Sequence, residues 1–204
     1  MTLLAVPNVS EGRDREAIAA IAAAFSHDGA RLLDIHSDPD HHRTVLTVAG
    51  APGELAYAVL AGARETLARI DLKTHTGRHP RVGAVDVAPI VYLDQADRGA
   101  ACAEALVLAD LLGAELELPV FLYGLLAENR TRAELRRGGL QELQSRVESG
   151  ELAPDFGPIR LHPTAGAVLV AARPPLVAFN IELAPPATLE QAREIAAAIR
   201  EDGP

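Results

Sequence analysis

The residues best suited to chemistry lie in the stretch 75–84, which holds two histidines, two arginines and two glycines directly ahead of an apolar, strand-like run. Catalytic and binding side chains are commonly held on loops at such strand ends. Pro80 fixes its own φ and pushes the preceding His79 toward extended geometry, so a stiff piece of backbone presents this imidazole. A histidine titrates near neutral pH and can accept and return a proton within one catalytic cycle. His79 is therefore the candidate general base, suited to acyl-like transfer between nitrogen atoms.

Two other interpretations of the same histidines stay open. His75 and His79 would serve only structure if they hydrogen-bond a tight loop. Their spacing would suit zinc on a continuous helix with further ligands, but Gly77 and Pro80 both argue against a helix at this point. The single cysteine, Cys102, gives neither a disulfide nor a cysteine-based metal site and is expected to pack in the core.

A second polar cluster lies in a turn between two β-like runs. Its histidines and aspartates alternate as in some metal loops, but the glycine and terminal glutamate of a calcium loop are missing. We therefore expect a solvated turn in which Arg43 binds an anion and His41 and His42 lie at the surface. The cluster consists of Asp34, His36, Asp38, Asp40, His41, His42 and Arg43.

A third candidate is the stretch 154–166, rich in proline and glycine and without helix or strand periodicity. Long loops in compact domains are often functional. Phe156 offers a ring to a flat ligand, and Arg160 could pair with a carboxylate. A domain linker fits the composition as well. The chain contains neither a GxxxxGK nor a GxGxxG motif, so the sequence gives no support for nucleotide binding.

The elements that must position these residues follow from the apolar periodicity. The pattern predicts strands over 3–9, 31–36, 44–49 and 85–92, and helices over 14–25 and 51–70. This β-α-β-β-α-β order is the ferredoxin-like arrangement of the α+β class, an antiparallel sheet with helices packed on one face. Further α/β elements extend the core. They are helices over 95–112, 131–149 and 188–201, strands over 120–123 and 167–172, and an apolar run over 176–183.

Composition limits the class of protein. The 204 residues suffice for one fair-sized core. A net charge of −9 argues against nucleic acid or an anionic membrane as the main partner. No apolar run approaches the roughly 20 residues that a membrane span needs, and the N-terminus lacks the features of a signal peptide. We therefore expect a soluble cytoplasmic protein.

Six segments together resemble the N-terminal part of the glutamate formimidoyltransferase family, the formiminotransferases of histidine degradation. They run in family order across essentially the whole chain, which makes the resemblance specific. The segments are 6–12, 43–45, 79–87, 119–124, 154–158 and 176–180.

The resemblance implies transfer of the formimino group from N-formimino-L-glutamate to N5 of tetrahydrofolate, giving 5-formiminotetrahydrofolate and L-glutamate, without a metal or nucleotide. The family's catalytic histidine corresponds to His79. Because both substrates carry carboxylates, Arg43, Arg81, Arg160 and Arg173 become candidate anchors. The family's folate-contacting loop corresponds to Gly157, Pro158, Ile159, Arg160, Leu161, His162, Pro163, Thr164, Ala165 and Gly166.

The resemblance also predicts the domain organisation. Residues 1–175 correspond to the family's N-terminal subdomain, and 176–204 to the start of a truncated second subdomain. A homodimer is expected. The alternative is a non-catalytic paralogue that binds folate or a carboxylate and associates through its incomplete C-terminal unit, with 176–183 as an unpartnered edge strand.

Overall fold

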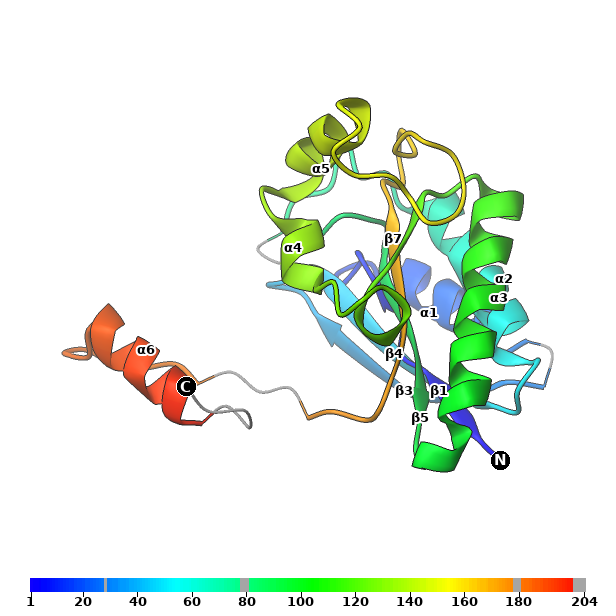
Figure 1. The fold of residues 1–204 in the computed structure, drawn as a ribbon, viewed down its shortest axis with the longest axis horizontal. Helices are drawn as coiled ribbons and strands as arrows, with labels where there is room; N and C mark the ends of the chain where they lie inside the picture. The colour runs from blue at the N-terminus through cyan, green and yellow to red at the C-terminus, as the bar shows by residue number, and fades with distance from the viewer. Residues whose placement is uncertain (28, 78–80, 178–180, 200–204) are drawn as a thin grey trace.

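The computed structural model describes residues 1–27, 29–77, 81–177 and 181–199. A seven-stranded mixed sheet forms its centre, and helices pack on both faces of this sheet (Figure 1). The strands are β1 (Leu3–Ala5), β2 (Asn8–Val9), β3 (Arg31–Asp38), β4 (Arg43–Gly50), β5 (Val85–Tyr92), β6 (Val120–Leu122) and β7 (Val168–Arg173). The helices are α1 (Arg15–Ala24), α2 (Leu55–Arg69), α3 (Arg98–Leu116), α4 (Arg132–Arg136), α5 (Gly139–Glu148) and α6 (Leu189–Ala198), with short 3-10 turns η1 (Gln95–Asp97) and η2 (Gly124–Leu126).

The first half of the chain has the predicted ferredoxin-like topology, so the α+β fold class is confirmed. β3 pairs with β4, and β1 and β2 lie between β4 and β5, all antiparallel. The strand expected over 3–9 is divided into β1 and β2 at Pro7, which has no N–H to donate to the ladder. α1 and α2 pack on one face of these strands and bury their apolar sides there.

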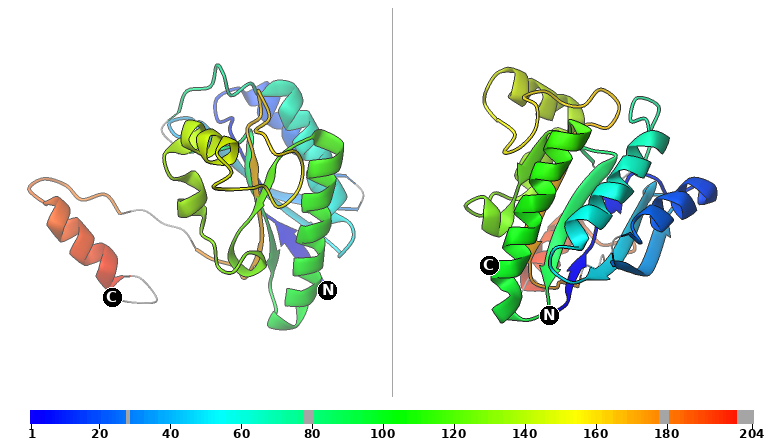
Figure 2. Two further views of the ribbon diagram at one scale, coloured as in Figure 1. Left: turned by 45° about the horizontal axis from the view of Figure 1, so that its top comes forward. Right: turned by 90° about the vertical axis from the view of Figure 1, so that its right-hand side faces the viewer.

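The second half extends the sheet with parallel strands. β7 pairs with β5, and β6 pairs with β7. α3 joins α1 and α2 on the same face, where the three helices lie side by side (Figure 2, right). α4 and α5 cover the opposite face over β5, β6 and β7, through a second apolar cluster that includes Phe121, Leu135 and Leu143. Every residue of β5 is buried, since this strand lies between both layers.

Two expectations about secondary structure are wrong. The helix expected over 131–149 is split into α4 and α5, because Gly138 and Gly139 adopt positive φ angles of 71° and 74°. In the described parts of 176–183 no strand forms, since Pro174 and Pro175 end the ladder after β7. α6 follows with no buried residue and lies apart from the body of the molecule (Figure 1).

A membrane-spanning helix must be both long and apolar. Among the described residues, no helix is both long and apolar enough to cross a bilayer.

A substitution at Gly83 would test the close packing of the main chain just before β5. A Cβ at this position would lie 1.8 Å from the main-chain oxygen of Ala167 and 2.6 Å from that of Val85, so the backbone must move to admit it. We expect Gly83→Ala to lower the free energy of unfolding by roughly 2–4 kcal/mol, measured by urea denaturation. Gly99 in α3 has nothing within 4 Å of its Cβ position, so Gly99→Ala is the matched control. Equal stability of the two variants would contradict the packing.

Candidate active site

The loop between α2 and β5 carries the predicted base. His79 itself, with Arg78 and Pro80, lies outside the described residues, whereas the stems on both sides of it are described. The Arg81 side chain joins these stems, because its Nη2 donates to the main-chain oxygen of His75 at 2.9 Å. On the second stem, the buried carboxylate of Asp86 accepts from the Val82 N–H at 2.8 Å. The described stems of this loop, up to residue 77 and from residue 81, are therefore held by side chains of the same loop and of β5.

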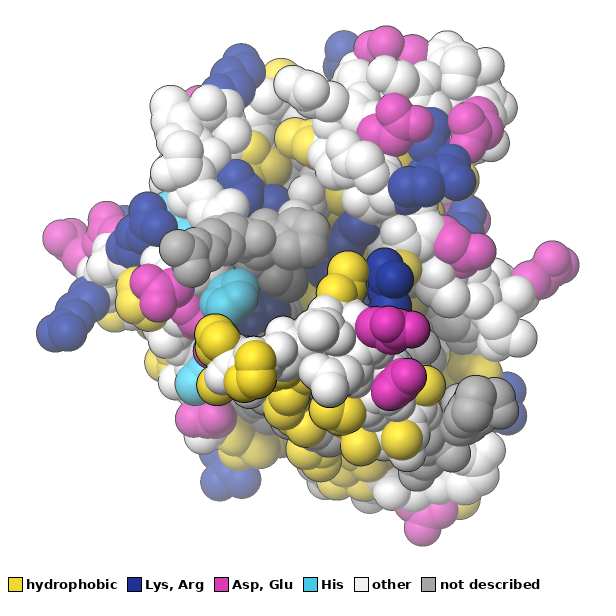
Figure 3. Space-filling model, turned by 90° about the vertical axis from the view of Figure 1, so that its left-hand side faces the viewer, with side chains coloured by type: hydrophobic (Ala, Val, Ile, Leu, Met, Phe, Trp, Pro, Cys, Tyr) yellow, Lys and Arg dark blue, Asp and Glu magenta, His cyan; other side chains and the backbone are white. Residues whose placement is uncertain are grey.

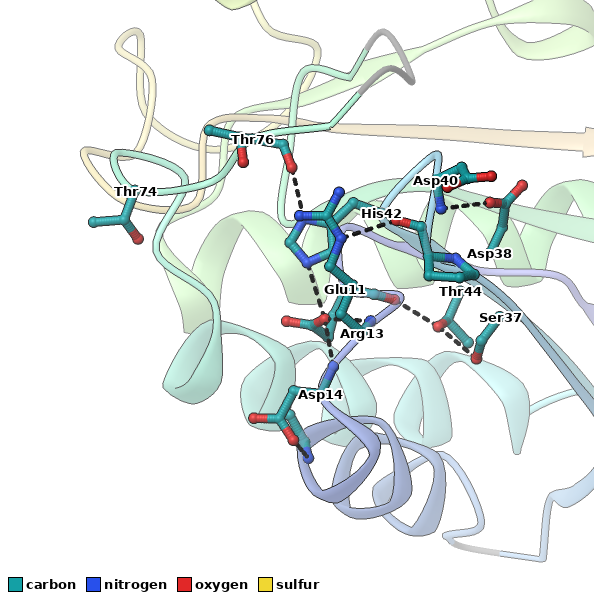
Figure 4. A network of polar contacts seen from close by, with 12 residues as sticks. Glu11, Arg13, Asp14, Ser37, Asp38, Asp40, His42, Thr44, Thr74 and Thr76 are labelled. Carbon is teal, nitrogen blue, oxygen red and sulfur yellow. Dashed lines mark hydrogen bonds and ion pairs between the residues drawn. The ribbon is translucent and has the colours of Figure 1, made fainter.

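His42 holds the first stem in place from the β3–β4 turn. Its Nδ1 lies 2.9 Å from the main-chain oxygen of Thr76, and its Nε2 lies 3.0 Å from the carboxylate of Glu11. Figure 4 shows the ring between these two groups. Both partners are acceptors, so both ring nitrogens must carry a proton to make the two hydrogen bonds. The arrangement favours an imidazolium at His42 paired with an ionised Glu11.

The state of Glu11 agrees with this pairing. Burial raises the pKa of its carboxyl, but the N–H groups of Asp14 and Arg13, together with His42, outweigh burial and leave the pKa below its ordinary value. The Asp14 and Arg13 N–H groups lie at the start of α1, where a carboxylate is well placed. Glu11 thus connects the start of α1 to the β3–β4 turn.

His42 was expected at the surface, and this is wrong. Its side chain is only 13% exposed, because residues 75–77 lie against it. His41 does lie at the surface, with 42% of its side chain exposed and Nδ1 2.5 Å from Asp38. The position of His42 depends on a contact between residues 34 apart in sequence, which no local pattern reveals.

His75 stacks on His42, with ring centroids 4.1 Å apart and planes inclined by 21°. Burial, followed by the positive charges of Arg81 and His42, lowers the pKa of His75 to about 4. Both of its ring nitrogens are buried and make no hydrogen bond of normal geometry within the described ranges. His75 is therefore neutral at neutral pH and a weak base, consistent with supporting the loop rather than exchanging protons.

The predicted folate loop packs against the same stems. The Leu72 N–H donates to the main-chain oxygen of Thr164 at 2.8 Å, and the Ala84 N–H donates to that of Ala165 at 2.9 Å. The Ala167 N–H in turn donates to Val82 at 2.9 Å. Two segments about eighty residues apart in sequence thus meet through their main chains. Their contact is so close that a Cβ on Gly166 would lie 2.2 Å from the Val82 oxygen.

The other end of the folate loop is fixed by Asp155, which accepts from the Leu122 N–H at 2.7 Å and forms an ion pair with Arg130. Phe156 packs against the core beneath α3, so its ring serves packing. Between these ends, Ile159 is 77% exposed and Arg160 is exposed as well, which leaves the middle of the loop open to a ligand.

Apart from Arg160 in the folate loop, the three other predicted carboxylate anchors lie at different places. Arg43 begins β4 beside the β3–β4 turn, and its Nε is buried without a hydrogen-bond partner among the described residues. The Arg81 side chain donates a hydrogen bond to the main-chain oxygen of His75 within its own loop. Arg173 ends β7, donates to the main-chain oxygen of Pro174 at 3.0 Å and lies beside Tyr123. Arg43 and Arg173 occupy opposite ends of the sheet, so the structure does not bring all three together.

Sequence reasoning missed several of the groups that build this region. The family resemblance could have indicated three of them, because its segments contain Glu11, Asp86 and Tyr123. No sequence pattern indicated Arg136, which lies on α4 and forms an ion pair with Asp86. No group of three or more potential metal ligands occurs among the residues that the structure describes.

Comparison with known proteins identifies the fold family. Residues 2–173 match the model of the formiminotransferase domain, N-terminal subdomain. The chain is 41% identical over 207 residues to the formimidoyltransferase-cyclodeaminase of Sus scrofa, covering 97% of this chain and 37% of that protein.

Shorter relatives match over more of their own length. The glutamate formimidoyltransferases of Streptococcus pyogenes serotype M1 and Thermoplasma acidophilum are 35% and 36% identical, over 97% of this chain and 67% of each relative. The chain therefore spans about two thirds of these proteins, and 37% of the cyclodeaminase relative.

His75 predicts a pH dependence of stability. When the pH falls, unfolded His75 gains a proton near its ordinary pKa of 6.5, whereas folded His75 gains it only near pH 4. The stabilisation is therefore present above about pH 6.5 and is lost as the pH falls to about 4. Because the side chain is partly solvated, we expect a loss of only about 1–2 kcal/mol in the free energy of unfolding, measured by urea denaturation across this window.

The matched variant is His75→Gln, which does not titrate and is expected to show a flatter dependence over the same window. Glu11, whose pKa lies below 4.5, loses its contribution only at lower pH. The exposed His27 provides the control substitution His27→Gln. An unchanged slope in His75→Gln would contradict the assignment.

The pair of Glu11 and His42 is tested by a double-mutant cycle with alanine at each position. We expect a coupling free energy of about 1–2 kcal/mol, since both partners are largely buried and hydrogen-bonded to main chain. The exposed pair Arg64 and Glu115 gives the comparison, with an expected coupling below about 1 kcal/mol. Additive effects of the Glu11 and His42 substitutions would contradict the pairing.

Proposed function

We propose, from the premise that this chain belongs to the formiminotransferase N-terminal subdomain family, that it takes part in formimino transfer from N-formimino-L-glutamate to N5 of tetrahydrofolate. The observation that supports this proposal is the main-chain contact between the loop of His79 and the loop 157–166. A folate held by the second loop would lie next to a base carried by the first. Tetrahydrofolate is then a co-substrate, and L-glutamate is the product released.

The chemistry requires a group that both accepts and donates a proton. Attack of the folate N5 on the amidine carbon gives a cationic tetrahedral adduct, which must lose a proton. The departing glutamate nitrogen must gain one when its bond to that carbon breaks. In our proposal His79 performs both transfers, a contribution of roughly 10²–10⁴-fold in rate.

The described neighbours of His79 suit this role. His75 has a pKa near 4, so it does not compete for the proton at neutral pH. Arg81 on the second stem and His42 beside the first stem place positive charge near the loop, which in our proposal disfavours a further positive charge on His79 and leaves it able to accept a proton. Arg43, Arg81 and Arg173 remain the proposed carboxylate anchors.

A second candidate function is a non-catalytic module that binds folate or a carboxylate and associates with another chain through residues 176–204. The observation that favours it is α6, a helix with a complete capping box at Thr188 but no buried residue. Its apolar side chains Leu189 and Ile195 are 67% and 40% exposed. Such a face is stable only when another surface covers it. In either function we propose 1–175 as the first structural unit.

A transfer assay with formiminoglutamate and tetrahydrofolate distinguishes the two functions. We expect turnover by the chain to fall roughly 10²–10⁴-fold in His79→Ala, because the proton transfers lose their catalyst. His27→Ala replaces an exposed histidine after α1 and is expected to keep full activity. Activity that survives His79→Ala refutes the proposed base.

The same assay is run on the chain extended through a second subdomain. Turnover only in the extended form would show that 176–204 must be completed for catalysis. Absence of turnover in both forms, with retained stabilisation by folate, would favour the binding module.

A further inference from the structure

A group of basic side chains surrounds Tyr123 on the face of the sheet that α4 covers. We call Tyr123, Arg132, Arg136 and Arg173 the Tyr123 cluster. Tyr123 directly follows β6, Arg173 ends β7, and the two other arginines lie one turn apart on α4. The guanidinium carbon of Arg132 lies 5.8 Å from the centre of the Tyr123 ring. Figure 3 shows dark-blue side chains set back in a hollow on this side of the molecule.

The positive charge of the Tyr123 cluster is not balanced by carboxylates. Arg136 forms an ion pair with Asp86, but neither Arg132 nor Arg173 has a carboxylate partner within the described ranges. Arg173 is partly buried, and burial lowers its pKa; Tyr123 opposes this shift and Arg132 adds to it. This local excess of positive charge occurs in a protein whose net charge is −9. Arg132 is exposed, whereas Arg136 and Arg173 are partly buried, where like charges held together are costly unless an anion joins them.

The cluster also contains donors without acceptors. Tyr123 is only 7% exposed, and its hydroxyl lies beside the Arg173 guanidinium but makes no hydrogen bond of normal geometry within the described part of the chain. The Nε of Arg136 is likewise buried and unpartnered there. Buried polar groups are rarely left unsatisfied, and each such group costs stability. Burial also raises the pKa of Tyr123, so its hydroxyl keeps the proton that it can donate.

We propose that the Tyr123 cluster is a carboxylate-binding subsite. Guanidinium groups bind carboxylates through paired, parallel hydrogen bonds, and a phenol hydroxyl adds a third donor. The nature of the natural ligand, a glutamyl carboxylate, rests on the proposed function, whereas the existence of the subsite does not. That carboxylate belongs either to the formimino donor or to the glutamyl tail of the folate.

The position of the cluster suits the far end of an extended ligand. Asp86, next to the stem that follows His79, is the second residue of β5, and Arg173 pairs with Val91 five residues further along the same strand. At a rise of about 3.3 Å per residue, the two positions are about 17 Å apart. The Asp86–Arg136 ion pair bridges part of this distance. A substrate whose reacting group lies near His79 would reach the cluster with its carboxylate.

The test uses glutarate, a dicarboxylate that cannot react, titrated into the chain labelled with ¹⁵N. We expect the side-chain Nε–H signals of Arg132, Arg136 and Arg173 to shift with saturation. Arg173→Gln and Arg132→Gln should each raise the Kd about tenfold or more, and Tyr123→Phe about fivefold. Arg64→Gln, on the opposite side of the sheet, is the control and should leave the Kd unchanged. Absence of shifts, or a Kd that these variants do not alter, overturns the proposal.

Because glutarate is not turned over, this result is independent of catalysis. If the chain binds glutarate at the cluster but neither it nor the extended form turns over substrate, the subsite stands and the proposed function is refuted. In a second arm, N-formimino-L-glutamate and tetrahydrofolate are added separately to the glutarate-bound chain. The substrate that displaces glutarate is the source of the carboxylate, and displacement by neither overturns the assignment to a substrate.

Discussion

The arrangement of the candidate site depends on the close approach of two main-chain segments, 82–84 and 165–167. Their hydrogen bonds require that no Cβ stands between them, which glycine at 83 and 166 provides. The N-terminal segment joins the same place, because Ser10 donates through its hydroxyl to the Gly83 oxygen and through its N–H to the Ala84 oxygen, each at 2.8 Å. Three segments far apart in sequence are thereby held at the start of β5. Any widening of this junction would separate the loop of His79 from the loop 157–166.

The two described histidines near this junction, His42 and His75, differ in their electrostatic surroundings. His42 meets two acceptors, while the adjacent His75 is buried against positive charge with a pKa near 4. Stacking a neutral ring on a charged one lets both pack closely without placing two like charges in contact. The stem before His79 is thus held by two stacked imidazoles, of which His75 is too weak a base to accept a proton at neutral pH.

Much of the fold could be predicted, because apolar periodicity is a local property of the sequence. The runs that became β4 and β5, and the helical pattern of α2, were found to within a few residues. The pairing of β5 with β7 was not predicted, since it depends on contacts about eighty residues apart. The division between α4 and α5 was missed because two adjacent glycines adopt positive φ within an otherwise helical pattern. In the site, motif residues indicated the two loops, but not the burial of His42 or the ion pair of Arg136 with Asp86.

The mixed sheet explains why the two parts of the candidate site share one face. In open parallel sheets, ligands usually bind beyond the carboxyl ends of the strands. Here Tyr123 and Arg173 occupy the carboxyl ends of β6 and β7, whereas the loops 71–84 and 157–166 lead into the amino ends of β5 and β7. The α4 face of the sheet connects these ends through Asp86 and Arg136. An extended anionic substrate lying across that face would meet the proposed base at one end of the strands and unbalanced positive charge at the other.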